Sequence, residues 1–335
     1  MNIFAVFLCI LLFNQISAQD IDISYLENDN IVVGVLPDIG GRIVYFGTKN
    51  GGNVLKAVPC LWNDSTNEKP GISEVINYKA YHGNIIWPSP MNEWWSKQNV
   101  FPQKRINGNR WPPDPSLIYG EYSVIERGKE SLKWESLPSL VSGIQVTQQI
   151  ELSEGNEMVF KVQFKNITDS TIHWGIWFNT RLEGRANCYV RASDKRSFYI
   201  HEKEKLKRLI PSEFDMGYFS FLSEKIQDPY EKVYTKVGID AADNFIAAFS
   251  GKQLLLIETP GIDRKRIHPD HTFVEIYNQL MPDSKDDLLE LEFHSEYEEI
   301  KPGEIIEAYQ IWKVYDTNEI QGRKNQITYL NTIKP

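Results

Sequence analysis

Short runs of β-branched and aromatic residues recur along the whole chain, and turn-forming pairs such as Pro37-Asp38 and Gly51-Gly52 separate them. Few windows carry the 3.6-residue apolar stripe of a helix, and the best of them, residues 202–209, is short and highly charged. Closely spaced strands without alternating helices predict an all-β protein of antiparallel sheets packed as a sandwich. The predicted strands cover residues 31–36, 41–46, 122–125, 144–150, 158–164, 245–249, 291–297 and 308–314, with one more ending at Asn278.

The N-terminus has the pattern of a secretory leader. Residues 1–19 contain no Asp, Glu, Lys or Arg, residues 4–13 are almost all apolar, and Ile16-Ser-Ala18 precedes Gln19 as a small-residue cleavage site. We therefore expect a signal peptide over residues 1–19 and an exported mature chain, periplasmic or secreted. No later segment approaches the ~18 consecutive apolar residues of a membrane anchor. Because no repeat or low-complexity linker divides residues 20–335, they are predicted to form a single domain, and we expect a monomer.

The charge balance excludes some classes of partner. The formal net charge is −9, which argues against binding nucleic acid or an anionic membrane surface. Two cysteines, Cys60 and Cys188, follow the leader, and whether they pair in an oxidising compartment stays open. No cysteine or histidine spacing matches a strong metal motif, so neither a metal nor another cofactor is predicted.

A segment rich in tryptophan and proline interrupts the strands. Residues 81–115 contain four tryptophans and six prolines, and so many prolines predict a long structured loop instead of a regular ladder. The C–H face of a pyranose ring stacks on an indole, so Trp87, Trp95 and Trp111 are candidate sugar platforms, with Asp114 among the polar groups that would take hydroxyls. The alternative that these tryptophans only pack the loop onto the sheets stays open.

Further candidates lie elsewhere. His173, Trp177 and Arg181 alternate along one face of a predicted strand, a composition more typical of a pocket wall than of a dry core. Arg42 follows a glycine turn and could reach a hydroxyl, although an arginine in a strand is more often ion-paired. His271 and Glu275 flank the start of a strand near the C-terminus and are candidate substrate-binding residues.

The order of several segments resembles the galactose mutarotase-like superfamily and, more narrowly, exported bacterial proteins of the DUF4380 type, a family of unknown function. The segments are Pro37-Asp-Ile-Gly-Gly-Arg-Ile43, Gly83-Asn-Ile-Ile-Trp-Pro-Ser-Pro90, Trp111-Pro-Pro-Asp114, His268-Pro-Asp270, Val274-Glu-Ile-Tyr-Asn278, Leu289-Glu-Leu-Glu292 and Pro302-Gly-Glu304. The resemblance covers most of residues 20–335. It implies a β-supersandwich of two large twisted antiparallel sheets, with a carbohydrate ligand in a cleft across the concave sheet.

The resemblance also implies a chemistry. In mutarotases a glutamate removes the proton of the anomeric hydroxyl while a histidine protonates the ring oxygen, and each such group contributes roughly 10²–10⁴-fold. Glu292 matches the position of that glutamate, with Glu290 on the same strand face as the fallback. Trp177 stands where the mutarotase histidine is expected, so His173, four residues earlier, and His82, in a His-Gly pair, are the candidate acids.

The sequence leaves several functions open. The first is an aldose 1-epimerase-like enzyme with Glu292 as base. The second is a binding protein that has kept the cleft and lost the acid, as Trp177 in place of a histidine suggests. The third is a polysaccharide lyase or glycoside hydrolase, for which Asp114 and Glu292 are the nominated pair of carboxylates. A structural sandwich within a larger envelope complex is the fourth.

Overall fold

The computed structural model of the chain describes residues 23–62, 78–108, 111–201, 209–227, 229–318 and 320–334. The predicted signal peptide lies outside these residues, as does the predicted helix at 202–209 apart from Leu209. No helix among the described residues is long and apolar enough to cross a membrane. Cys60 is exposed and Cys188 is buried, and both are free thiols.

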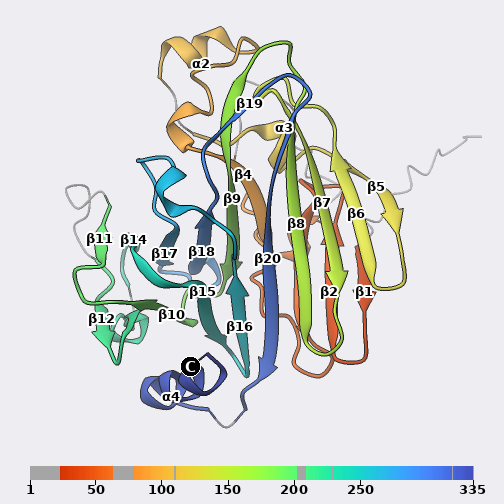
Figure 1. Cartoon of the computed structure of the whole chain (residues 1–335). Helices are drawn as coiled ribbons and strands as arrows, with labels where there is room; N and C mark the ends of the chain where they lie inside the picture. The colour runs from red at the N-terminus through yellow and green to blue at the C-terminus, as the bar shows by residue number, and fades with distance from the viewer. Residues whose placement is uncertain are drawn as a thin grey trace, which may run out of the picture.

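Two ten-stranded antiparallel sheets pack face to face, which confirms the predicted sandwich (Figure 1). The first sheet has the order β1-β2-β3-β4-β9-β18-β17-β14-β11, with β19 also paired to β9. Its strands are β1 (Ser24–Glu27), β2 (Ile31–Leu36), β3 (Arg42–Thr48), β4 (Asn84–Ser89), β9 (Ile172–Leu182), β11 (Phe198–Ile200), β14 (Val233–Ile239), β17 (Val274–Leu280), β18 (Leu288–His294) and β19 (Glu298–Ile300).

The second sheet has the order β12-β13-β10-β15-β16-β20-β8-β7-β6-β5. Its strands are β5 (Tyr122–Arg127), β6 (Ser131–Ser136), β7 (Ile144–Leu152), β8 (Glu157–Asn166), β10 (Asn187–Ala192), β12 (Ser212–Asp215), β13 (Tyr218–Phe221), β15 (Ala241–Ser250), β16 (Gln253–Glu258) and β20 (Ile305–Asp316). Along β7 and β8 buried and more exposed residues alternate, because one face packs on the first sheet and the other faces solvent.

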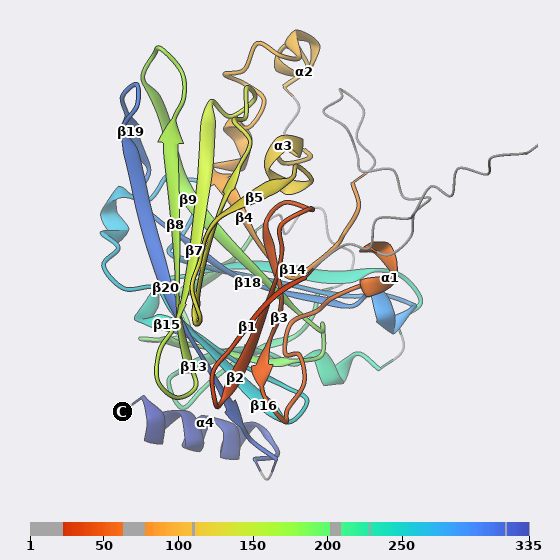
Figure 2. The same ribbon diagram turned by 90° about the vertical axis from the view of Figure 1, so that its right-hand side faces the viewer.

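In the part of the chain that the structure describes, helices are few and short, and they lie outside the sheets. They are α1 (Pro59–Trp62), α2 (Pro102–Ile106), α3 (Pro115–Ile118) and α4 (Arg323–Ile333), with single 3-10 turns at Met91–Glu93, Ser223–Lys225, Arg264–Arg266 and Ser284–Asp286. Ile327 and Leu330 of α4 pack on the outer face of β15 and β16, at the opposite end of the sandwich from α2 and α3 (Figure 2). The main core lies between the sheets and includes Phe46, Phe160, Phe178 and Trp312.

One part of the loop prediction is wrong. Residues 84–89, inside the tryptophan-rich segment, form strand β4, which pairs with β9 from Asn84↔Thr180 to Ser89↔Gly175. Pro88 fits this strand because β4 meets β3 only at Asn84, so no strand of the described residues pairs with its far edge beyond that point. The carbonyl of Pro88 faces that free edge and accepts a hydrogen bond from Trp94 Nε1.

Candidate functional site

A cavity of about 620 Å³ lies over the face of the first sheet that points away from the core. Side chains along a strand alternate between the two faces of a sheet. On β18, Leu289, Leu291 and Phe293 therefore enter the core, while Glu290 and Glu292 face the cavity. The same alternation turns outward Trp177 and Arg181 of β9, Glu275 and Tyr277 of β17, and Tyr234 and Lys236 of β14.

Strand register brings the ionisable groups of the cavity floor together. Glu275 of β17 lies directly opposite Glu292 of β18. Lys236 reaches between them from β14, with its Nζ 2.9 Å from Glu275 Oε2 and hydrogen-bonded to Glu292 Oε2. Trp177 Nε1 donates a second hydrogen bond of 3.0 Å to the same oxygen of Glu292. The other oxygen, Glu292 Oε1, is buried and has no hydrogen-bond partner among the described residues.

The two carboxylates differ in their proton affinity. Burial raises the pKa of Glu292 to about 8, against the opposing effect of Lys236 and with added repulsion from Glu290 and Glu275. Burial also acts on Glu275, but Lys236, His294 and His271 outweigh it and hold the pKa of that carboxyl well below its ordinary value. One carboxylate of the pair thus stays ionised, while the other exchanges its proton near neutral pH, as general acid–base catalysis requires.

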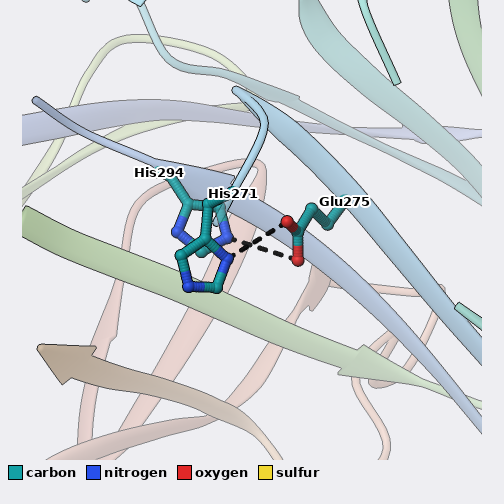
Figure 3. A group of neighbouring side chains, drawn as sticks. All are labelled: His271, Glu275 and His294. Atoms are coloured by element: carbon teal, nitrogen blue, oxygen red, sulfur yellow. Dashed lines mark hydrogen bonds and ion pairs between the residues drawn. The ribbon is translucent and has the colours of Figure 1, made fainter. Parts of the chain in front are cut away.

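Two histidines lie beside the carboxylate of Glu275 (Figure 3). His271 Nδ1 lies 3.1 Å from Glu275 Oε1, and His294 Nε2 lies 3.6 Å from Glu275 Oε2. The two imidazole rings stack with their centroids 4.1 Å apart, and Trp177 packs against both. Burial and the neighbouring His271 lower the pKa of His294 to about 3, so this ring is neutral.

Aromatic rings form the wall of the cavity. Trp87 and Trp177 meet edge to face with centroids 4.9 Å apart, and Trp111 lies 6.2 Å from Trp87. Trp111 is 45 % exposed and contacts Tyr78 at 4.8 Å, so it presents a free indole face at the rim. Arg181 lies over Trp87 and forms a 2.9 Å ion pair with Glu290.

Eight of the twelve predicted site residues line this cavity. They are His82, Trp87, Trp111, Trp177, Arg181, His271, Glu275 and Glu292. Of the two candidate acids, His82 is the one in the cavity wall. Burial, helped by Arg181, Lys56 and Arg42, lowers the pKa of His82 to about 2, so it faces the cavity as a neutral imidazole.

His173 does not reach the cavity. It shares the predicted strand face with Trp177, but β9 changes partner between them, from β19 at His173 to β18 at Trp177. His173 Nε2 lies 3.8 Å from Glu299, and its ring stacks on Tyr297 beside a separate cavity of about 470 Å³. Six residues of strand separate His173 from Asn179, the partner of Glu292, which corresponds to roughly 20 Å.

Trp95, Asp114 and Arg42 also lie outside the cavity lining. Trp95 is fully buried and donates its Nε1 hydrogen to the carbonyl of Pro112, so it packs the loop. The carboxylate of Asp114 is buried and caps the first turn of α3 through Ser116 N, and it also accepts hydrogen bonds from Ser139 and Ser142. The predicted pairing of Asp114 with Glu292 is therefore not formed.

Arg42 has a structural position. Its guanidinium is buried and donates to three backbone carbonyls, those of Ile39 at 2.8 Å, His82 at 3.0 Å and Ile118 at 2.6 Å. His82 has a positive φ of 59° next to Gly83, and the bonds from Arg42 hold this turn against the C-terminal end of α3. Arg42 thus supports the cavity wall from behind.

Sequence reasoning missed His294 and Lys236. His294 follows Glu290 and Glu292 at the same two-residue spacing, so extending the alternation used for that pair by one step would have found it. Lys236 lies on β14, in a region where no strand was predicted, and nothing in its local sequence points to a site.

Comparison with known proteins supports the fold. Similar solved structures include a candidate aldose 1-epimerase from Escherichia coli K12, with 14 % identity, 88 % of this chain and 99 % of that chain covered, and a TM-score of 0.57. A galactose mutarotase-like protein from Lactobacillus casei has 9 % identity, 88 % and 100 % coverage, and a TM-score of 0.51. A candidate aldose 1-epimerase from Klebsiella pneumoniae has 10 % identity, 91 % and 81 % coverage, and a TM-score of 0.52.

At these identities the likeness shows the galactose mutarotase-like fold and no more. No curated protein matches the chain by sequence. The family model described as "Domain of unknown function (DUF4380)" matches residues 21–315, and the chain therefore belongs to the DUF4380 family.

Proposed function

We propose that this chain is an exported protein that binds a carbohydrate in the cavity over the first sheet and interconverts its anomers as an aldose 1-epimerase-like enzyme. The observation that carries the proposal is the combination of an aromatic wall and an ionisable floor in one cavity of about 620 Å³. Ligand sites typically occupy roughly 300–1,000 Å³, with apolar walls and a few convergent polar groups. Sugars need both, because their ring faces stack and their hydroxyls hydrogen-bond.

Trp87, Trp111 and Trp177 supply the stacking surfaces. Trp111 is the most accessible of the three, while Trp177 lies deeper and its indole N–H is already used by Glu292. A sugar ring stacked on this wall would present its hydroxyls to the carboxylates of Glu275 and Glu292 on the floor. The mutarotase-like fold of the similar structures supports the same reaction class by analogy alone.

Anomer interconversion requires two proton transfers. Glu292 takes the proton of the anomeric hydroxyl, a carbonyl forms at that carbon, and the bond from this carbon to the ring oxygen breaks as the oxygen gains a proton. Lys236 donates a hydrogen bond to Glu292 from the same floor, and its charge stabilises the ionised carboxylate that takes the first proton. The ring oxygen takes the second proton from water in the cavity. Ring closure after rotation reverses both transfers, so no other reactant is consumed.

A second candidate function is saccharide binding without turnover. Two observations favour it. Trp177 occupies the strand position where the resemblance led us to expect a histidine, and the imidazole of His82 is neutral. A hydrolase with Asp114 and Glu292 as its carboxylates is not supported, because Asp114 is buried beneath α3.

Saturation-transfer NMR of residues 20–335 with a panel of mono- and oligosaccharides tests the proposal. Exchange between anomers is read in the same samples. We expect binding with accelerated exchange, and Glu292→Gln should abolish the exchange and keep the fold. Glu299→Gln, which removes an exposed carboxylate away from the cavity, is the matched control and should behave as the wild type. Binding without exchange would select the second candidate, and no binding to any sugar would refute both.

A further inference from the structure

We propose that His271, Glu275 and His294 form a binding site for a divalent transition metal of the zinc type on the floor of the cavity (Figure 3). This site goes beyond the proposed function, because it stands on its own geometry and makes no assumption about a sugar. One ligand atom from each residue lies within 4.8 Å of the other two. Two histidines and one glutamate are a ligand set of three-residue zinc sites that keep one coordination position open.

The spacing of the donors fits a shared ion. His271 Nδ1 is 3.1 Å from Glu275 Oε1, and His294 Nε2 is 3.6 Å from Glu275 Oε2. Ligands at about 2.1 Å from a tetrahedral zinc ion are separated from one another by roughly 3.4 Å. Small rotations of the two side chains would therefore bring their nitrogens onto one ion without moving the strands.

His294 supplies an independent observation. Its side chain is completely buried, and its Nε2 has no partner within 3.5 Å among the described residues, although buried polar atoms are normally paired; the acceptor that it faces, Glu275 Oε2, lies 3.6 Å away. The other ring nitrogen, Nδ1, lies 3.2 Å from Ser89 Oγ. If Nδ1 carries the hydrogen and donates it to Ser89, the lone pair of Nε2 faces the carboxylate of Glu275. Two acceptors that face one another in this way are stabilised by a cation between them.

The surroundings resemble those of a metal ligand. A ligating histidine usually uses its second nitrogen in an outer hydrogen bond that holds the ring in place, as the Ser89 contact of His294 does here. Glu275 Oε1 is similarly held by the backbone N–H of Thr272 at 3.2 Å. His271 and Glu275 line the cavity, so an ion can enter from it, and its open position would accept water or a hydroxyl group.

Lys236 opposes binding, since its ammonium contacts the same carboxylate oxygen, Glu275 Oε2, and His201 Nε2 also lies 3.8 Å from Glu275 Oε1. Lys236 has a second carboxylate, Glu292, to which it can remain bound when an ion takes Glu275. The metal and the ammonium therefore compete for Glu275, and removing the ammonium should strengthen metal binding.

The test is a titration of chelator-treated protein with Zn²⁺ and Co²⁺ in the absence of saccharide, followed by calorimetry, by metal analysis after dialysis and by Co²⁺ absorption. We expect one ion per chain. His271→Gln should weaken Zn²⁺ binding at least about 100-fold, and Ser89→Ala roughly 10-fold. Lys236→Gln should tighten it roughly 10-fold or more. His268→Gln, three residues before His271 and outside the cluster, is the control and should leave the affinity unchanged.

The proposal is refuted if the wild type retains no stoichiometric ion, or if His271→Gln and His268→Gln bind Zn²⁺ equally. His271 is chosen over the buried His294 because its loss is less disruptive to folding, and the opposite effect expected for Lys236→Gln separates a metal site from a general loss of structure. Because no sugar is present, failure here leaves the saccharide experiment intact, and failure to bind sugars leaves the metal titration intact.

Discussion

Replacing Arg42 by methionine separates a structural role from a role in ligand binding. The guanidinium makes three hydrogen bonds to buried carbonyls, and bonds from a charged donor contribute roughly 1.5–3 kcal/mol each, or about 5–9 kcal/mol together. Burial lowers the pKa of Arg42 from 12.5 to about 10, which corresponds to a desolvation cost of roughly 3 kcal/mol. The difference predicts that Arg42→Met lowers the free energy of unfolding by about 2–6 kcal/mol.

Urea unfolding followed by tryptophan fluorescence measures this loss. With a slope of roughly 3 kcal/mol per molar urea, the midpoint should fall by about 0.7–2 M. The matched control is Arg196→Met, an exposed arginine bonded to Asp194, which should change the unfolding free energy by less than about 0.5 kcal/mol. An Arg42→Met midpoint within about 0.2 M of the wild type, together with lost saccharide binding, would show that Arg42 is a ligand residue and that this reasoning is wrong.

Three further predictions distinguish cavity residues from packing residues. Trp111→Ala should weaken saccharide binding by about 5–30-fold in calorimetry, with little change in thermal unfolding. Trp95→Ala, which removes a buried side chain, should instead lower the free energy of unfolding by roughly 3–5 kcal/mol. Equal losses of stability in the two variants would contradict this distinction. The pKa of His82 is about 2 in the folded chain and near 6.5 in the unfolded chain, so the unfolded chain binds more protons below pH 6.5. The free energy of unfolding therefore falls on acidification by up to roughly 1.4 kcal/mol per pH unit. His82→Asn should therefore lose less unfolding free energy between pH 7 and pH 5 than the wild type, and parallel losses would exclude the effect. Asp114→Ala should destabilise the fold by roughly 2–4 kcal/mol, because it leaves the buried donors of Ser139 and Ser142 without an acceptor; unchanged urea unfolding would return Asp114 to the ligand-binding candidates.

Most predicted strands are present in the structure because their residues alternate with the period of a half-buried strand. The runs 144–150 and 158–164 alternate in this way and lie within β7 and β8, while the run 31–36 corresponds to β2, whose residues are mostly buried. In β9 burial does not alternate, because both faces of the strand are covered and every residue from Trp174 to Leu182 is buried, but the residue types on its outward face still alternate. The sequence pattern fails as a guide at Pro88, where a strand edge that is unpaired among the described residues tolerates a residue that lacks an N–H group.

The residues of the candidate site also differ in whether a sequence pattern could identify them. Trp177 and Arg181 were found because they alternate along one face of a predicted strand, and Glu292 was found because it matches the position of the mutarotase glutamate in the resemblance. Asp114 and Trp95 lie outside the cavity lining, and the sequence could not show this because their hydrogen-bond partners, Ser139 and Pro112, are not adjacent to them in sequence.

By itself the sequence determined the antiparallel β architecture, the family resemblance and the residue types available for a sugar site, since these depend on local alternation and on motif order. Tertiary structure alone decided which ionisable groups meet. Register between β17 and β18 sets Glu275 against Glu292, and the neighbouring strand β14 adds Lys236. His294 is likewise brought to the carboxylate of Glu275 by the pairing of β18 with β17, whereas His271 lies only four residues before Glu275 in sequence. A contact between strands follows from register and sheet order, which no local pattern encodes.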